Sequence, residues 1–166
     1  WHMAGRLGED YHATDLLTDI LGGNNSSRLY QQLVKEQKLF VHLDCYHFGS
    51  SDPSLLTIEG KLVEGISMEK AEQALQIEID KICKEGPSEQ ELQKVKNKTE
   101  SLIAFEDMSV MSRASSLAYY ELLGDAAWMN TELQQYANVT TAQIKKVSNQ
   151  LFRAENSNTL YYYATK

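Results

Sequence analysis

Apolar positions in the first part of the chain follow a helical spacing before they give way to a strand-like pattern. Asp10–Leu21 places its apolar residues at helical spacing. Gly22–Gly23 follows, as expected where a helix ends on a residue in the left-handed conformation. Asn24–Ser27 offers capping residues for a second helix, whose apolar stripe begins at Leu29.

Two strands are predicted next in the chain. Leu39–Phe48 and Leu55–Val63 are rich in β-branched and aromatic residues, and the turn residues of Gly49–Pro53 separate them. This arrangement predicts an antiparallel pair. A further strand-like run, Thr159–Thr165 (TLYYYAT), closes the sequence, and a short strand is expected to open it.

The stretch between these strands predicts several helices. Met68–Lys84 and Ser109–Leu123 have apolar residues at helical spacing, and a glycine follows each of them closely. Ser88–Glu91 and Thr140–Gln143 read as capping boxes, in which a Ser or Thr oxygen accepts from a free amide of the first helical turn. Each box opens a predicted helix, and Ala126–Ala137 predicts another.

This order of elements favours an α+β fold over a parallel wound sheet, because most strands are grouped apart from the helices. We predict an antiparallel sheet with helices on one face. No linker, repeat or low-complexity tract divides the sequence, so residues 1–166 are predicted to form a single domain. The sequence begins with Trp1 rather than Met, which leads us to expect a piece of a longer protein.

Composition and charge exclude some functional classes. The net charge of -7 argues against a sequence-independent nucleic-acid binder, which needs a basic face to displace phosphate counterions. No apolar run approaches the ~20 residues of a membrane helix, and no signal peptide is visible. We expect a soluble protein and leave cytoplasm and periplasm both open.

The chain has two cysteines, which are too few for a disulfide framework. Cys45 and Cys83 are expected to be free core thiols.

The segment LGGNNSSRL (residues 21–29) has two readings, a phosphate-binding loop or a corner between two helices. A P-loop needs a preceding strand and a Gly-Lys-Ser/Thr ending. A dinucleotide fingerprint needs G-x-G-x-x-G after a strand. A predicted helix precedes this segment and neither pattern occurs, so the corner is favoured. An anion held at the start of the second helix is the remaining alternative.

The residues provide no self-sufficient active site. His-x-x-Glu-His does not occur, and the pair His12 and Asp15 has no apparent third ligand. His42 and His47 differ by an odd number, which places them on opposite faces of a regular strand. No serine lies in Gly-x-Ser-x-Gly. We therefore assign no catalytic residue, no metal ligand and no cofactor to this chain.

Four motifs in order resemble the C-terminal-type, noncatalytic domain of the M16 (insulinase/pitrilysin/mitochondrial processing peptidase) zinc metallopeptidases. The family pattern is an apolar helix, Leu-Gly-Gly, a polar loop, Ser-Arg-Leu, and a helix ending in Leu-Arg-Glu-x-x-Gly-Leu-Ala-Tyr. The segments GPSEQELQKVKNK, SRASSLAYYELLGD and NVTTAQIKKVSNQLF resemble three later elements of the family. The residues that match the first motif are Leu21, Gly22, Gly23, Ser27, Arg28 and Leu29.

The resemblance implies an M16 peptidase-like (LuxS/MPP-like metallohydrolase) fold and a supporting role. Such a domain pairs with an N-terminal-type M16 domain, in the same chain or in a partner subunit, and helps to enclose a peptide substrate. Zinc would be held by that other domain. The alternative is an inactive scaffold or interaction domain in an M16-like assembly. An independent small-molecule enzyme is disfavoured because no catalytic constellation is present.

The chain departs from the family at two positions that contact substrate in active members. Aligning Leu33 with the family Leu places Val34 at the Arg position. The Tyr position then falls on Val41, or on Phe40 if the register slips by one. Arg and Tyr can stabilise a developing oxyanion, whereas these apolar residues cannot, and loss of one such donor costs on the order of 10²–10³ in rate. Two explanations follow. Either the partner domain supplies these donors, or this chain is the structural, noncatalytic half of a two-protein assembly.

Overall fold

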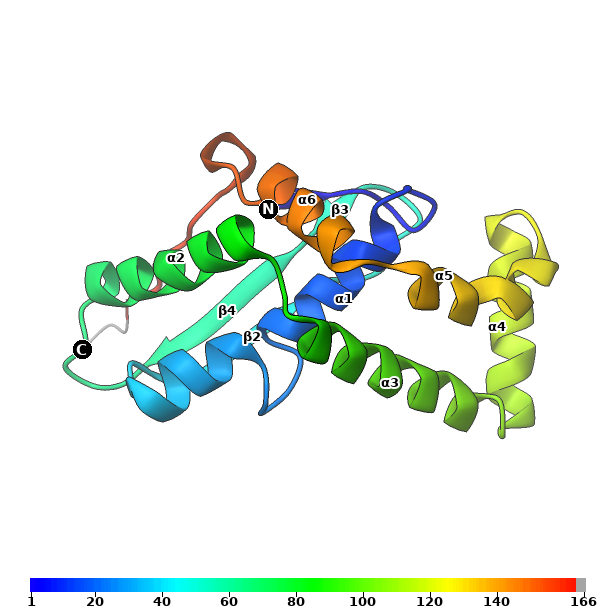
Figure 1. The fold of residues 1–166 in the computed structure, drawn as a ribbon, viewed down its shortest axis with the longest axis horizontal. Coiled ribbons are helices and arrows are strands. Elements are labelled where there is room, and N and C mark those ends of the chain that lie inside the picture. Colours follow the sequence, from blue (N-terminus) through cyan, green and yellow to red (C-terminus); the bar gives the residue numbers. More distant parts are fainter. Residues whose placement is uncertain (164–166) are drawn as a thin grey trace.

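The structure is a computed structural model, and it describes residues 1–163. The fold consists of two small antiparallel sheets and a set of helices, most of which follow the last strand in the sequence (Figure 1). The strands are β1 His2–Met3, β2 Phe40–Tyr46, β3 Ser54–Leu55 and β4 Thr57–Leu62. The α-helices are α1 Tyr11–Leu21, α2 Met68–Glu85, α3 Glu89–Glu106, α4 Val110–Leu123, α5 Glu132–Asn138 and α6 Thr141–Leu151. The remaining elements are the π-helix η1 Tyr30–Glu36 and the 3₁₀ helices η2 Ala126–Thr131 and η3 Ala154–Asn156.

The α+β prediction is confirmed, and the antiparallel pair is β2 with β4. The expected single sheet is divided into two ladders that share one extended segment. Its first part, β3, pairs with β1, and its second part, β4, pairs with β2. Between them, the Leu56 N–H donates to the Trp1 carbonyl at 2.9 Å. The division follows from this change of partner at the buried residue Leu56.

Helix α1 lies at the centre of the molecule, with α3, α5, α6 and β2 packed around it (Figure 1). Eight of its eleven residues are buried, which explains why it is apolar on more than one face. The buried side chains of β2 are Phe40, Leu43 and Cys45, and all three belong to this core. Opposite residues of a ladder share a face, so His42, Asp44 and Tyr46 lie on the other face with their partners on β4.

The helix-start signals are confirmed by the observed caps. Ser88 accepts from the Glu91 amide at the start of α3, and Thr140 accepts from the Gln143 amide at the start of α6. In each case the third residue's side chain also accepts from the capping residue's amide, which completes the box. The predicted helix Ala126–Ala137 is the 3₁₀ helix η2 followed by α5.

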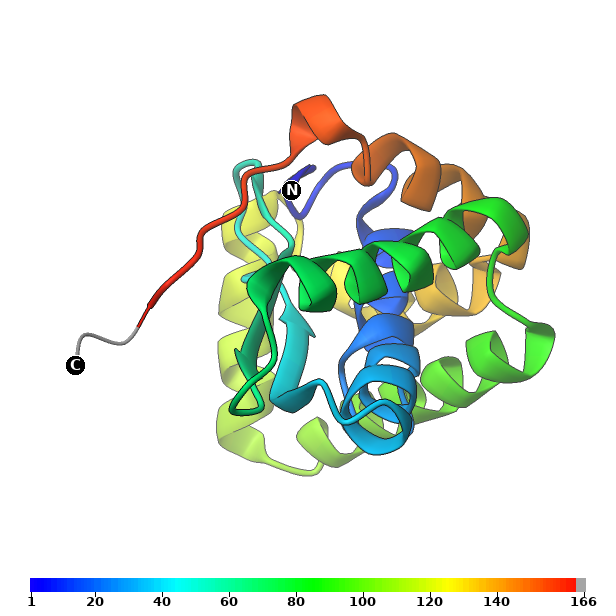
Figure 2. The ribbon, with the colours of Figure 1, turned by 90° about the vertical axis from the view of Figure 1, so that its left-hand side faces the viewer.

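Two local predictions were wrong. Residues 159–163 of the predicted strand Thr159–Thr165 form no strand, and its last two residues lie outside the described part. This stretch runs away from the body (Figure 2), where no neighbouring strand of residues 1–163 provides a hydrogen-bond ladder.

The second concerns the end of α1. Gly22 does end this helix, but its φ of -145° is not left-handed. The prediction that Cys45 is a free, buried thiol is confirmed, whereas Cys83 is free but only half-buried.

Candidate functional site

The Gly22–Ser27 loop is a corner between α1 and the helix that begins at Arg28, as predicted. Gly22 is required there by close approach, because a Cβ on it would lie 2.5 Å from the Cys45 amide nitrogen of β2. Gly23 is similarly crowded, by Asp19. The two glycines of the Leu-Gly-Gly motif therefore let the corner lie directly against β2. No cap from Ser27 contributes, since its buried hydroxyl has no hydrogen-bond partner within residues 1–163.

Arg28 fixes the far side of this corner to another helix. Its Nε donates to Glu91 Oε1 at 2.6 Å and its Nη2 to Glu91 Oε2 at 2.8 Å. The same Nη2 donates to the Gly86 carbonyl at 3.1 Å, at the end of α2. The hydrogen bond from Arg28 lowers the pKa of Glu91 to about 2. Arg28 of the Ser-Arg-Leu motif is thus a structural clamp between the corner, α2 and α3.

The helix after the corner is a π-helix over seven residues, Tyr30–Glu36. At its end the Gln37 N–H donates to the Gln32 carbonyl five residues earlier, which is the hydrogen-bond spacing of a π-helix. Such helices are rare and usually shorter, and they occur frequently at functional sites. Lys38 follows with φ of 52°, the one positive φ of a non-glycine residue in the described chain. Lys38 is also the position at which the family motif carries glycine.

The positions that correspond to the family Arg and Tyr differ in accessibility. Val34 lies on the π-helix and packs partly buried against the core. Phe40 is buried, whereas Val41 is 60% exposed. Val41 is also the extra residue of a bulge, since β4 partners are found for Phe40 and His42 but not for it. Of the two residues predicted for the Tyr position, Val41 is therefore the accessible one.

The edge of β2 opposite β4 opens onto a groove. Its volume is about 470 Å³, and one wall is formed by five consecutive strand residues, His42–Tyr46. Consecutive residues of a strand point to alternate faces, so a surface that reaches all five runs along the strand edge. Gly22–Asn25 and Tyr30 form the other wall. We call this the β2-edge groove.

The exposed face of the β2–β4 pair is polar. His42 Nε2 lies 2.8 Å from Asp44 Oδ2, and the Tyr46 hydroxyl donates to Glu59 Oε2 at 3.0 Å. Asp44 and Glu59 are directly opposite each other across the ladder, and like charges in such a pair are unfavourable. The hydrogen bond to Glu59 raises the pKa of Tyr46. This face therefore offers donors, acceptors and negative charge rather than an apolar wall.

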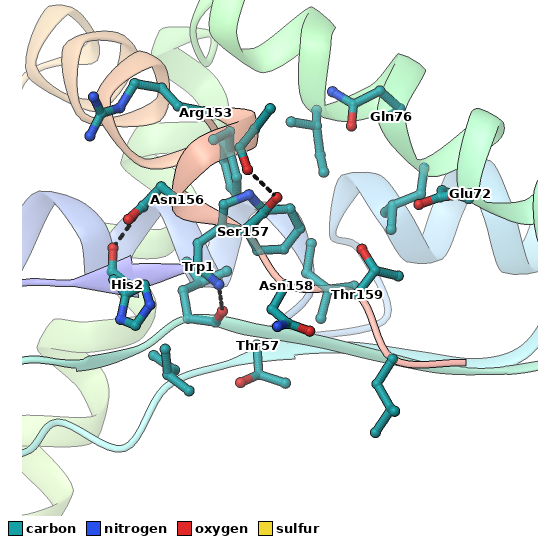
Figure 3. A pocket seen from close by; sticks show the side chains of 18 residues that line it. Trp1, His2, Thr57, Glu72, Gln76, Arg153, Asn156, Ser157, Asn158 and Thr159 are labelled. Carbon is teal, nitrogen blue, oxygen red and sulfur yellow. Dashed lines mark hydrogen bonds between the residues drawn. The ribbon is translucent and has the colours of Figure 1, made fainter. Parts of the chain in front are cut away.

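A second, larger groove follows the other edge of the strands (Figure 3). Its volume is about 540 Å³, and Leu55–Ile58 forms one side. Glu72 and Gln76 of α2 and the segment Phe152–Leu160 close the others. In Figure 3 the Asn156 side chain donates to the His2 carbonyl at 3.0 Å, which holds the closing segment over the first strand.

A buried polar network joins α1 to the helices beyond it. Arg6 and His12 both contact Glu132 Oε1, and the Arg6 guanidinium also donates to Tyr120. Burial alone would raise the pKa of Glu132, but hydrogen bonds from His12 and Arg6 lower it to about 2. This cluster could not be predicted from the sequence, because its members lie on an irregular segment and three helices and no spacing rule connects them.

Asp15 belongs to a second part of this network. It accepts from Tyr136 at 2.6 Å and lies 2.8 Å from His47 Nε2. The Gly49 amide donates to His47 Nδ1 at 3.0 Å, which assigns the ring proton to Nε2. Despite burial, the hydrogen bonds from His47 and Tyr136 lower the pKa of Asp15. His12 and Asp15, which are one turn apart on α1, therefore contact different partners.

The described residues do not fit a zinc site. Residues 1–163 contain no group of three or more His, Cys, Asp or Glu side chains that could hold a metal ion. His12 and His47, the best-buried histidines, are each committed to a carboxylate and a second partner.

Comparison with known families identifies this architecture. The family model described as the Peptidase M16 inactive domain matches residues 1–99. The chain belongs to the M16 inactive-domain family. Its Gly-Gly corner, Arg28 clamp and β2-edge groove all lie within the matched residues. A comparison with curated proteins found no match.

Solved structures share the fold at low sequence identity. The inactive peptidase domain of a candidate zinc protease from Bordetella parapertussis superposes with a TM-score of 0.89 at 20% identity, covering 100% of this chain and 90% of that one. A protease from Helicobacter pylori gives 0.82 at 21% identity and 90% coverage. The periplasmic protease PqqL from Escherichia coli gives 0.65 at 16% identity and 90% coverage.

Some of the matched proteins are much longer than this chain. The chain spans 36% of the Helicobacter pylori protease and 17% of the Escherichia coli protein.

Within residues 1–163, no helix is both long and apolar enough to cross a membrane.

Proposed function

We propose that this chain is the noncatalytic substrate-chamber domain of an M16-type zinc metalloendopeptidase. It helps to enclose an extended peptide that is hydrolysed at a zinc site in another domain. That companion is an N-terminal-type M16 domain, in the same polypeptide or in a partner subunit. Residues 1–166 would then be one domain of a larger assembly.

The observation that carries this proposal is the open edge of β2. Within residues 1–163, β2 pairs only with β4, and the opposite edge faces the β2-edge groove. An unpaired strand edge presents backbone N–H and C=O groups that an extended peptide can pair with. Such pairing binds many sequences, because the contacts are made by the peptide backbone.

The walls of the groove suit an unfolded, polar peptide. Gly22 and Gly23 have no side chains to fill the groove, and Asn25 and Tyr30 offer side-chain donors and acceptors to a peptide. The bulged residue Val41 lies at the entrance to the strand. Its side chain has no hydrogen-bond donor, so stabilisation of the reaction's developing charge falls to the companion domain, while this domain binds and positions the peptide.

The test is hydrogen exchange of the chain with and without a reduced, unfolded peptide. Peptide pairing is expected to slow exchange of amides in β2. The variant Asn25→Trp, which places a large side chain in the groove from an exposed position, is expected to abolish this protection. Its matched control, Asn158→Trp, fills the second groove instead and is expected to preserve it.

Two outcomes would contradict the proposal. Exchange in β2 that does not respond to saturating peptide would exclude strand pairing there. Protection that is lost in Asn158→Trp but retained in Asn25→Trp would move peptide binding to the second groove, which also follows a strand edge.

The alternative is an inactive scaffold domain of an M16-like assembly. The feature in its favour is that the residues at the predicted Arg and Tyr positions are apolar: Val34 for the Arg, and Val41 or Phe40 for the Tyr. A scaffold predicts no peptide-dependent protection in β2, and the same exchange experiment therefore separates the two functions.

A further inference from the structure

Helix α4 carries a stripe of apolar residues on the side away from the body of the molecule. Met111 is 76% exposed and Leu122 is 83% exposed, and Ala114 and Ala118 lie between them at spacings of three and four. These four residues form one stripe of a helix. Within the described chain, none of the 14 residues of α4 is buried.

The inner side of α4 is attached by polar contacts. The Tyr119 hydroxyl donates to the Gly49 carbonyl at 3.4 Å, and Tyr120 accepts from Arg6 at 3.1 Å. Ser112 and Ser116 are among the half-buried residues of the helix. A helix of this length gains most of its stability from packing of an apolar face, yet within residues 1–163 the outward stripe stays largely exposed.

The apolar area continues around the turn that joins α3 to α4. Phe105 is 71% exposed, and Met108 and Val110 are similarly open. Figure 1 places this turn and α4 at the end of the molecule remote from the C-terminal segment. We call the combined area the α4 surface; it comprises Phe105, Met108, Val110, Met111, Leu117 and Leu122. Contiguous exposed apolar residues of this kind mark protein interaction sites.

Charge around the α4 surface is strongly one-sided. From residue 99 to residue 131 the chain has five acidic residues, one arginine and no lysine. The arginine is Arg113, and the acidic residues are Glu100, Glu106, Asp107, Glu121 and Asp125, all of them exposed. A complementary surface is therefore apolar at its centre and bordered by Lys and Arg. A second copy of this chain would bring like charges together.

We infer that the α4 surface docks onto the companion domain of the peptidase, at an apolar area bordered by basic side chains. The inference rests on the proposed function only in requiring a companion domain. It does not depend on peptide binding at the β2-edge groove. It assigns the exposed apolar residues of α4 to a permanent interdomain contact rather than to substrate.

Photo-cross-linking in the intact peptidase tests this assignment. A benzophenone amino acid at Met111 is expected to form a cross-link to the companion domain, beside Lys or Arg, as identified by mass spectrometry. The matched control is Ile77, an exposed apolar residue of α2 outside the surface, where no such product is expected. The substitution Leu122→Glu should lower the yield at Met111 about tenfold, because burial of an unpaired carboxylate costs more than about 1.4 kcal/mol.

The outcomes separate this inference from the function proposed above. Cross-links between two copies of α4, cross-links to other proteins, or no product at Met111 would each overturn the docking assignment. Loss of peptide-dependent protection in β2 with an intact Met111 cross-link would contradict the peptide-binding role and leave the docking contact standing. Leu122 is exposed, so the unfolding midpoint of the isolated Leu122→Glu chain should match that of the wild type.

Discussion

Arg28 and Glu91 are 63 residues apart in the sequence, yet two short hydrogen bonds join their side chains. Both were matched to family motifs from the sequence, Arg28 in Ser-Arg-Leu and Glu91 in a capping box. The box could be predicted because its partners are three residues apart. The contact between the two motifs could not, because it depends on how the corner packs against α3.

Acid should weaken this clamp in a predictable range. The pKa of Glu91 is about 2 in the folded chain and ordinarily about 4.5, so its contribution to stability is present above pH 5. It is lost as pH falls from about 5 to about 2. Glu91→Gln should lower the free energy of unfolding by about 1 to 2 kcal/mol at pH 7. The variant should also lose less stability than the wild type as pH falls from about 5 to about 2. Urea unfolding across pH measures both, and an unchanged pH profile in the variant would contradict this account.

Lys38 holds a conformation that suits glycine. Its φ of 52° is left-handed, which costs a non-glycine residue on the order of 1 kcal/mol. Lys38→Gly is therefore expected to raise the free energy of unfolding by up to about 1 kcal/mol, despite glycine's greater freedom in the unfolded chain. Denaturant unfolding provides the measurement, with the exposed Lys35→Gly, in the π-helix, as a destabilising control. A loss of stability in Lys38→Gly would show that the conformation is not strained.

At the scale of elements, most helices could be predicted because their signals are local. Ser67, Ser88, Ser109 and Thr140 each accept from an amide of the following helical turn, and Gly86 ends α2 with positive φ. The prediction of a final strand was wrong because its signal was not local. A strand needs a neighbouring strand as a hydrogen-bond partner, and the composition of Thr159–Thr165 does not show whether one is present.

The corner and β2 are matched in shape, and this match is expected to limit substitution. Gly22→Ala would force the corner away from β2, since its Cβ would overlap Cys45. We expect a loss of more than about 2 kcal/mol, as for other overpacked core positions. Asn25→Ala, in the same loop but exposed, should change stability by less than about 0.5 kcal/mol. Equal unfolding midpoints for the two variants would contradict the close approach.

At the scale of the whole molecule, the sequence predicted a supporting domain without chemistry of its own, but not its surfaces. The β2-edge groove exists because the Gly-Gly corner, Tyr30 and β2 meet in space. The α4 surface appears only once the body-facing side of the helix is known. The family resemblance placed Val34, and Val41 or Phe40, at substrate positions, and their role there stays a prediction.

The central claim is that this chain supports peptide hydrolysis carried out at a zinc site elsewhere. The most direct measurement is cleavage of an unfolded peptide, with metal content, for this chain alone and for the intact protein joined with its companion domain. We predict no zinc and no cleavage for the chain alone, and chelator-sensitive cleavage for the assembly that Asn25→Trp weakens by raising KM. Zinc-dependent cleavage by the chain alone, or assembly kinetics that Asn25→Trp leaves unchanged, would contradict the account.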